Sequence, residues 1–202
     1  PFAANSHNEL LQSPGTPRPH WQPLIDSLSG EEPAEMRKRV ENVRRLVHEN
    51  GLTYNAYADT QGGQRPWDLD PLPFILPQDE WAHIEAAVIQ RATILNTVLR
   101  DIYGEQTLMA QGMLPPALIH GNAGFLRPCH GIPQPDGVAL HMYAVDLARS
   151  ADGRWWVVSD RTQAPAGTGY ALENRMVISS VFPDLFRDLN IQRLSGFFAL
   201  GT

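Results

Sequence analysis

The sequence predicts a mixed helix-and-strand (α+β) fold, in which an antiparallel hairpin is flanked by helices. Three observations predict it. Apolar residues recur at helical spacing in two long segments, and two apolar runs flank the turn signal Asp152-Gly153. In addition, 43% of the 202 residues are hydrophobic, which is enough to bury a core. Helices combined with a hairpin, without internal repeats, indicate an α+β or mixed α/β architecture.

Residues 1–30 are expected to form an extended, proline-rich arm, and residues 31–202 the main domain. Five of the first 23 residues are prolines, and proline restricts φ and removes a backbone donor. The chain begins at Pro1 and has a single lysine, Lys38, beside 15 arginines. We interpret this pattern as that of a trimmed or excised segment.

Two amphipathic helices are predicted in the first half of the chain. In the first, apolar residues recur every three or four positions between Pro33 and the stop signal Asn50-Gly51. The second begins near Asp79 and ends at Gly104. Its apolar face is formed by Trp81, Ile84, Val88, Leu95, Leu99 and Ile102.

The connections around these helices are predicted from prolines and glycines. A short strand is expected over residues 52–57, followed by a break at Gly62-Gly63 and an extended strap, RPWDLDPLPFILP, over residues 65–77. A last helical segment is expected over residues 172–188, interrupted or kinked at Pro183.

The predicted hairpin contains two acidic residues whose relative orientation depends on the length of the turn. Its strands, residues 138–147 and 154–160, are apolar on both faces, which is typical of strands that are covered on both sides. A three-residue turn would set Asp146 and Asp160 side by side, whereas a two-residue turn would offset them to opposite faces. Facing carboxylates repel unless a cation such as Mg²⁺ lies between them. The alternative is a pair of solvated strand-end residues.

A glycine loop follows the hairpin directly. Gly167-Thr168-Gly169 can turn its amides inward as an anion-binding nest, before a helix that is expected to begin near Ala171. Arg161 and Arg175 flank the loop, and planar guanidinium groups suit bidentate phosphate contacts. The two hairpin aspartates, the two arginines and the glycine loop together predict a site that binds a triphosphate and magnesium. The alternative for the loop alone is a plain connecting turn.

Four motifs, NGLTYNAY, RPWDLDPLP, GFLRPCHG and YAVDLARSADGRWWVVSDRTQAPAGTGYALENR, carry a family resemblance. Together they resemble the opening region of the circularly permuted ATP-grasp family, which is related to glutathionylspermidine synthase-type amide ligases. The resemblance extends from about His20 to about Phe198, and DRTQAP-G-GYALENR is its longest motif. It implies that residues 31–202 are the amino-terminal portion of a circularly permuted ATP-grasp domain.

The resemblance implies an enzyme that phosphorylates a carboxylate with ATP and lets an amine attack the acyl phosphate. Asp146 and Asp160 would bind Mg²⁺, and Arg161 and Arg175 would act in catalysis. His120, Arg127 and His130 would contact substrate. The nucleotide loop and its cleft would be formed by Arg161, Gly167, Thr168, Gly169, Tyr170, Glu173, Asn174 and Arg175.

One departure from the family pattern concerns lysine. ATP-grasp enzymes hold the nucleotide with lysines, whereas Lys38 lies on a helix of surface character. We therefore expect this chain to carry about half of the nucleotide site, with the remaining carboxy-terminal part of the same polypeptide supplying the rest. The fragment alone is then expected to be inactive.

Composition excludes several partners. The net charge of -6 argues against nucleic-acid and anionic membrane surfaces, because both require clustered positive charge. No apolar run approaches the roughly 20 residues of a membrane span. The single cysteine, Cys129, rules out an internal disulfide and favours the cytoplasm.

Three alternative interpretations are a thiol enzyme, a zinc site and a non-catalytic binding module. Cys129 could act as a nucleophile with His120, His130 or His141 as the base, although neighbouring strand residues point in opposite directions. The same four residues match no familiar zinc spacing. Finally, the chain could be a non-catalytic module that binds a partner or self-associates through apolar surface around the proline strap.

Overall fold

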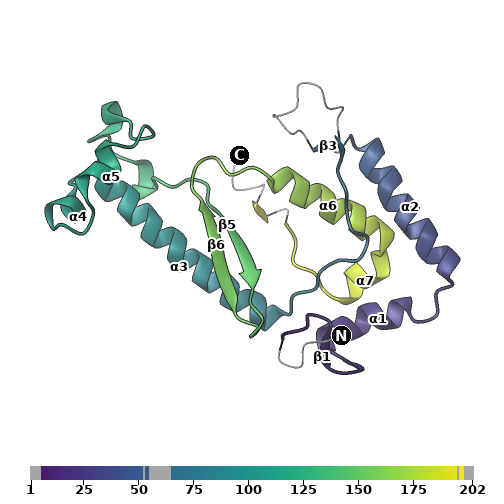
Figure 1. Cartoon of the computed structure of the whole chain (residues 1–202). Helices are drawn as coiled ribbons and strands as arrows, with labels where there is room; N and C mark the ends of the chain where they lie inside the picture. Colours follow the sequence, from purple (N-terminus) through teal and green to yellow (C-terminus); the bar gives the residue numbers. More distant parts are fainter. Residues whose placement is uncertain (1–5, 52, 55–64, 195, 198–202) are drawn as a thin grey trace. The chain divides into compact units, whose positions relative to one another are not determined.

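The computed structural model describes residues 6–51, 53–54, 65–194 and 196–197, and it divides into two compact units (Figure 1). The hairpin unit comprises Pro1–His7 and Pro77–Pro165. The helical unit comprises Asn8–Leu76 and Ala166–Thr202. Helices and two-stranded antiparallel sheets make up the described part of both units, so the predicted α+β class is confirmed.

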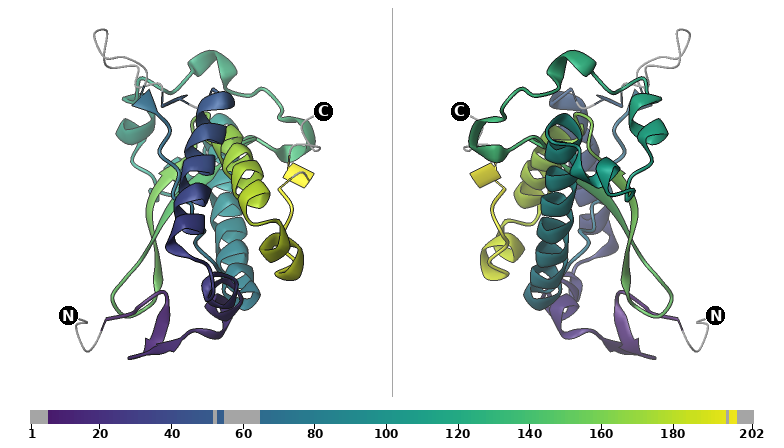
Figure 2. Two further views of the ribbon diagram at one scale, coloured as in Figure 1. Left: turned by 90° about the vertical axis from the view of Figure 1, so that its right-hand side faces the viewer. Right: turned by 90° about the vertical axis from the view of Figure 1, so that its left-hand side faces the viewer.

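The helical unit contains the larger core. Its elements are β1 Leu11–Ser13, β2 Thr16–Pro17, η1 Pro19–Trp21, α1 Gln22–Leu28, α2 Pro33–Glu49, β3 Thr53–Tyr54, β4 Arg65–Pro66, α6 Thr168–Val181 and α7 Pro183–Asp188. Helices α2 and α6 lie side by side in both views of Figure 2. The core cluster consists of Leu24, Val43, Val47, Val177, Ile178, Val181, Phe182 and Leu185.

The expected extended arm is wrong for part of the first 30 residues. Helix α1 forms over Gln22–Leu28, and Leu24 is only 3% exposed within the core cluster. Pro23 occupies the first turn of α1, where its missing N–H would have no helical partner in any case. The high proline content therefore did not prevent a helix that buries a core residue.

The predicted helix boundaries are largely confirmed in this unit. Helix α2 begins at Pro33 and ends at Glu49, and Gly51 follows with a φ of +67°. The predicted interruption at Pro183 separates α6 from α7, because Phe182 leaves helical geometry with φ −127° and ψ 58°. Helix α6 begins at Thr168, three residues before the expected start. Most of the strand expected over 52–57, and Gly62-Gly63, lie outside the described residues.

The hairpin unit is built on one long helix. Its elements are α3 Gln78–Tyr103, α4 Thr107–Ala110, α5 Pro116–His120, η2 Arg127–Cys129, η3 Pro135–Gly137, β5 Ala144–Arg149 and β6 Trp155–Arg161. Helix α3 and the hairpin β5–β6 confirm the corresponding predictions. Among the described residues, no helix, α3 included, combines the length and the apolar character needed to cross a membrane.

The first hairpin strand begins later than predicted. Strand β5 begins at Ala144, whereas the apolar run begins at Val138. The side chain of Asn96 on α3 accepts hydrogen bonds from the amides of Ala139 and Leu140 at 2.8 and 2.9 Å. It also donates to the Gly137 carbonyl at 3.1 Å. These contacts satisfy backbone groups that would otherwise pair with a neighbouring strand.

Two ion pairs attach the hairpin to α3. Near the turn, Glu80 accepts hydrogen bonds from Arg149 and from the indole of Trp155, the latter at 2.9 Å. Near the open end, Asp160 pairs with Arg91 at 2.6 Å. Glu80 and Arg91 are separated by roughly 16 Å along a helix, which matches the roughly 16 Å between Trp155 and Asp160 along a strand. One face of the hairpin is thereby held on the helix.

Candidate functional site

The register of the hairpin decides how its two acidic residues face. Asp146 pairs with Ser159, and Val145 pairs with Asp160. Residues directly opposite each other in an antiparallel pair share a face, and neighbours along a strand alternate. Asp146 and Asp160 therefore point to opposite faces. The side-by-side arrangement that a shared magnesium ion requires is wrong for this structure.

The turn and a bulge set this register. Ser150 donates to the Arg154 carbonyl at 2.9 Å, so the turn closes around Ala151–Gly153, with Gly153 at φ +85°. A register shift between Asp146 and Leu147 adds one residue to β6. The turn has three residues, but it is centred earlier in the chain than side-by-side carboxylates would need.

Asp160 lies on the face that packs against α3. Its carboxylate accepts hydrogen bonds from both the Nε and Nη2 atoms of Arg91, each at 2.6 Å, and from the Tyr143 hydroxyl at 2.5 Å. The bonds from Arg91, and then the bond from Tyr143, lower the pKa of Asp160 to about 2. Burial, followed by the bond to Asp160, raises the pKa of Tyr143 to about 12. The carboxylate is thus held as an anion.

Asp146 lies on the outer face of the hairpin. It accepts hydrogen bonds from the Ser159 hydroxyl and from Arg161 Nε, the latter at 2.9 Å. These two contacts, in that order, lower the pKa of Asp146. Its side chain is 45% exposed. Asp146 and Arg161 therefore form a solvent-accessible pair, and Arg161 is the one predicted catalytic arginine that lies on the hairpin.

No cluster of three or more His, Cys, Asp or Glu side chains able to hold a metal ion exists among the residues that the structure describes. Each hairpin carboxylate already pairs with a guanidinium group, Asp160 with Arg91 and Asp146 with Arg161. An arginine partner supplies the positive charge that a divalent ion would otherwise supply. The hairpin alone does not fit a single Mg²⁺ shared by both acids.

The predicted glycine loop lies in the helical unit and leads into α6. Gly167 precedes the helix with a φ of +115°, a conformation that favours glycine. The first helical hydrogen bond is donated by Ala171 to the Gly167 carbonyl at 3.0 Å. The amides of Thr168, Gly169 and Tyr170 precede that bond and have no intrahelical acceptor. A Cβ atom added to Gly167 or Gly169 would meet nothing within 4 Å, so the backbone there is open.

Three predicted cleft residues on α6 are engaged in contacts within the helical unit. The Tyr170 hydroxyl donates to the Thr53 carbonyl at 2.7 Å, and Asn174 accepts a hydrogen bond from the Trp67 indole at 2.9 Å. Glu173 accepts one from Asn50 at 3.2 Å. These side chains tie α6 to the neighbouring segments.

Arg175 differs from its neighbours on α6. Its guanidinium lies 5.6 Å from the centre of the Phe186 ring, and partial burial lowers its pKa. Within the described residues, no hydrogen bond or ion pair engages this side chain. A partly desolvated cation without an acidic partner is a suitable contact for an anionic ligand.

Comparison with known proteins places these features in a family. A family model for circularly permuted ATP-grasp type 2 proteins matches residues 73–200, which include α3, the hairpin, the glycine loop and α6. The chain belongs to this family. The resemblance noted in the sequence motifs is therefore confirmed.

Relatives of this ATP-grasp chain occur in Synechocystis and in Mycobacterium species. An uncharacterized protein of Synechocystis sp. is 38% identical over 193 residues, covering 96% of this chain and 40% of that protein. An uncharacterized protein of Mycobacterium tuberculosis is 35% identical over 191 residues, covering 91% of this chain and 22% of that protein. A second protein of the same organism is 31% identical over 183 residues, covering 91% of this chain and 32% of its own length. This ATP-grasp chain thus spans less than half the length of each.

The ATP-grasp chain presents the three proposed substrate residues after α4, His120 at the end of α5 and the other two in or next to η2. His120 ends α5 and packs edge-on against Phe125, with ring centres 5.2 Å apart. Tyr103 holds this segment at the end of α3, because its hydroxyl accepts a bond from Leu126 and its carbonyl one from Gly131. His120, Arg127 and His130 are all exposed, and their substrate role stays a prediction.

The structure of this ATP-grasp chain does not support Cys129 as a catalytic nucleophile. Cys129 is a free, partly buried cysteine in η2. Within residues 65–194, no hydrogen bond or ion pair links it to His120, His130 or His141. A nucleophilic cysteine needs an adjacent base, and the described geometry supplies none.

Sequence reasoning missed Arg91 and Tyr143, the partners of Asp160. Arg91 lies in the apolar stripe of α3, three residues after Val88 and four before Leu95. A charged residue in the apolar stripe of a helix requires a partner of opposite charge when that stripe packs against another element. That position in the stripe was the signal that could have revealed the pair.

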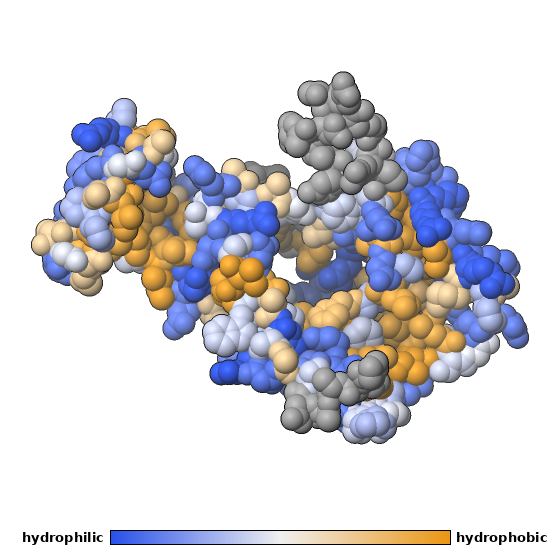
Figure 3. Space-filling model, in the orientation of Figure 1, coloured by the Kyte–Doolittle hydropathy of each residue, from blue (hydrophilic) through white to orange (hydrophobic). Residues whose placement is uncertain are grey.

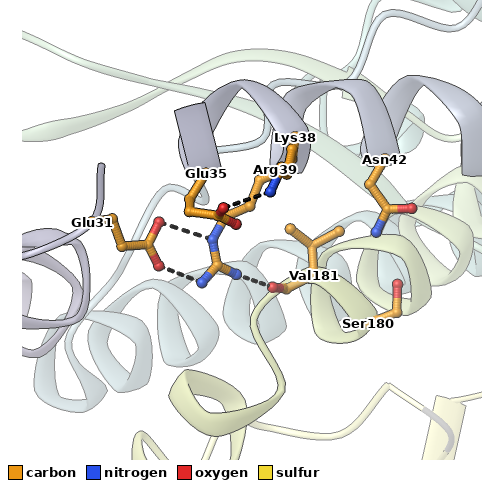
Figure 4. Close-up of a pocket in the computed structure, with 7 residues that line it drawn as sticks. All are labelled: Glu31, Glu35, Lys38, Arg39, Asn42, Ser180 and Val181. Atoms are coloured by element: carbon orange, nitrogen blue, oxygen red, sulfur yellow. Dashed lines mark hydrogen bonds and ion pairs between the residues drawn. The ribbon is translucent and has the colours of Figure 1, made fainter. Parts of the chain in front are cut away.

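A shallow hollow between α2 and the end of α6 has a volume of about 370 Å³ (Figure 4). Arg39 lies across it, pairing with Glu31 and donating to the Val181 carbonyl. Lys38, the only lysine, pairs with Glu35 at 2.6 Å on the same rim. The charged side chains that line the hollow are paired with one another, and Arg39 joins α2 to the end of α6.

Proposed function

We propose that this chain is part of an ATP-dependent ligase that joins a carboxylate to an amine through an acyl phosphate. Membership of the circularly permuted ATP-grasp family supports an ATP-dependent reaction. The observation that carries the proposal is the exposed first turn of α6, where a Cβ atom added to Gly167 or Gly169 would meet nothing within 4 Å.

The residues of this chain would bind and orient phosphate groups. Backbone amides at a helix start carry partial positive charge and suit phosphate oxygens. Arg175, which has no acidic partner in the described part, would add a full charge on the same helix. Phosphoryl transfer depends mainly on positioning and charge neutralisation, so these groups would act without a covalent nucleophile. On the hairpin, Arg161 is 60% exposed beside Asp146 and would itself be able to bind an anionic group.

Magnesium, when bound, would neutralise charge on the nucleotide phosphates. Asp146 and Asp160 do not fit one shared ion, because they lie on opposite faces of the hairpin. Of the two, Asp146 is the better candidate ligand, because its side chain is 45% exposed while that of Asp160 is 26% exposed and accepts three hydrogen bonds.

Further polypeptide would supply the remainder of the nucleotide site. The relatives extend well beyond the matched region, and the single lysine of this chain is paired on α2. The carboxylate and amine substrates would be held partly by that polypeptide and partly by His120, Arg127 and His130. The single cysteine and the use of ATP favour the cytoplasm as the compartment.

The test is to place a methyl group in the open backbone of the loop. Gly169→Ala adds a Cβ that meets no atom within 4 Å, so the fold is expected to persist, and alanine favours a helix over glycine. In the protein at its natural length, calorimetric titration with Mg-ATP should show binding that Gly169→Ala weakens at least roughly tenfold. Gly30→Ala, also in open space in the helical unit, is the matched control.

The control should leave the affinity unchanged. Absence of Mg-ATP binding by the unsubstituted protein would refute the ligase proposal. Equal affinities of Gly169→Ala and Gly30→Ala would refute the role of the loop.

A second candidate function is a non-catalytic module that binds a partner or self-associates. It is favoured by the apolar surface over the β5–β6 hairpin (Figure 3), where Trp156 is 55% and Val158 67% exposed. Exposed apolar surface of this kind commonly marks an interaction site. Sedimentation velocity over a range of concentrations should then show association that Trp156→Ser reduces, and a monomer at all concentrations would contradict it.

A further inference from the structure

Helix α6 is held by the proline strap at the turn that follows the glycine loop. Trp67 of the strap donates a hydrogen bond from its indole nitrogen to the Asn174 side-chain oxygen at 2.9 Å. The same indole packs on the Tyr170 ring, with centres 4.7 Å apart and planes inclined by 30°. Tyr170 and Asn174 are four residues apart on α6 and so share one face of the helix. A single side chain therefore contacts two successive turns.

The contact extends to strand β3. The Tyr170 hydroxyl donates to the backbone carbonyl of Thr53 at 2.7 Å. Thr53 pairs with Pro66, the residue before Trp67, in the β3–β4 ladder. Strand, strap and helix are thus joined in one set of contacts, which we call the Trp67 cluster: Thr53, Trp67, Tyr170 and Asn174.

The cluster lies directly beside the open backbone of Gly167–Gly169. Tyr170 follows Gly169, and the helix has no side-chain cap, because its N-cap residue is Gly167. Without a cap, the first turn of a helix frays unless tertiary contacts hold it. The Trp67 cluster supplies such contacts one residue after the loop.

We propose that Trp67 is a positioning residue for the phosphate-binding loop, and that Tyr170 and Asn174 orient α6 through it instead of contacting the nucleotide. This inference rests on the proposed function. The side-chain oxygens of Tyr170 and Asn174 are already engaged by Thr53 and Trp67. Binding a ligand with them would break hydrogen bonds that are partly buried.

Trp21 provides a matched control within the helical unit. Like Trp67, it is a partly buried tryptophan packed against the core cluster. Its indole nitrogen is buried and has no hydrogen-bond partner in the described part. Replacing it by phenylalanine removes similar ring area but no hydrogen bond. Trp21→Phe and Trp67→Phe therefore differ mainly in the bond to Asn174.

The experiment uses the protein at its natural length and two measurements. Amide hydrogen exchange of Ala171 reports whether the first turn of α6 is ordered, because its amide makes the first helical bond. Calorimetry reports Mg-ATP affinity. Trp67→Phe and Asn174→Ala should each speed Ala171 exchange and weaken Mg-ATP binding by roughly three- to tenfold, the effect of one lost hydrogen bond.

Conservative substitution separates positioning from general stability. Asn174→Asp keeps an oxygen that can accept the indole hydrogen bond, so the exchange rate of Ala171 in this variant should stay close to that of the unsubstituted protein. Trp21→Phe should alter neither measurement.

The outcomes separate this inference from the proposed function. Unchanged Ala171 exchange in Trp67→Phe and Asn174→Ala would overturn the inference, whether or not the protein binds ATP. Faster exchange with no Mg-ATP binding by the unsubstituted protein would uphold the ordering of the turn and refute the proposed function. Faster exchange with full Mg-ATP affinity would overturn the link from Trp67 to the loop.

Discussion

Asp146 and Asp160 occupy opposite faces of one hairpin, because Asp146 pairs with Ser159 while Asp160 pairs with Val145. Asp160 faces α3 and is bound by Arg91, and Asp146 faces outward with Arg161. The two acids therefore have separate roles. Asp160 anchors the hairpin, and Asp146 remains accessible for binding.

Asp160 should titrate with a pKa of about 2, below the ordinary value of 3.8, because Arg91 and then Tyr143 donate hydrogen bonds to it. Arg91→Gln should raise this pKa by about one unit or more, since an adjacent guanidinium lowers a carboxyl pKa by that order. Carboxyl-carbon NMR across an acid titration measures it. Asp146 is the internal control, and its pKa should not move because it lies on the other face.

The lowered pKa of Asp160 determines how the free energy of unfolding depends on pH. The Asp160 carboxylate contributes its full stabilisation above pH 3.8, and the contribution is lost as the pH falls through about 2. In Arg91→Gln the folded pKa lies closer to the unfolded value, so stability should fall less steeply over this window. Urea midpoints measured between pH 2 and 4 test this, and identical slopes would contradict the pairing.

Neither hairpin carboxylate should bind Mn²⁺ tightly in the absence of nucleotide. Each is already paired with an arginine, and the described residues hold no cluster of metal-binding side chains. Paramagnetic resonance of free Mn²⁺ should detect no site with a Kd below about 1 mM, the weak end of carboxylate sites. Asp146→Asn and Asp160→Asn should match the unsubstituted protein. Loss of one tight site by both substitutions would instead indicate a shared ion.

Leu24→Ala should destabilise the helical unit by about 2–5 kcal/mol, the usual cost of removing a buried leucine side chain. Leu24 is 3% exposed and belongs to the core cluster, although it lies in the segment expected to be an extended arm. Equilibrium urea denaturation measures the change. Leu72→Ala, at a leucine that is 47% exposed, should change stability by less than about 0.5 kcal/mol. Equal effects would show that α1 does not contribute to the core.

The helices could be predicted from sequence because their apolar spacing and end signals agree. Helix α2 begins at Pro33 and is followed by Gly51, and α3 ends before Gly104, as the pattern indicated. Proline content alone does not predict helix α1, because the effect of a proline depends on its position in the helix. Pro23 lies in the first turn, where it does not interrupt a helix.

The candidate site was less predictable than the helices. Whether Asp146 meets Asp160 depends on where the turn closes and on a single bulged residue in β6, and neither has a distinctive sequence pattern. The late start of β5 depends on Asn96, which is more than 40 residues away. Gly167, by contrast, was recognisable, because glycine readily adopts the positive φ found there.

Glu80→Leu should destabilise the hairpin unit by about 3–5 kcal/mol, because it removes the Glu80 carboxylate from a nearly buried guanidinium. The side chain of Arg149 is only 9% exposed, and Glu80 also accepts the Trp155 indole hydrogen bond at 2.9 Å. Glu80→Gln, which retains an acceptor for the indole, should cost less than Glu80→Leu. The exposed Glu85 on the same helix gives the control, Glu85→Leu. Thermal unfolding followed by tryptophan fluorescence measures all three, and a Glu80→Leu midpoint equal to that of Glu85→Leu would show that the pair does not hold β5–β6 on α3.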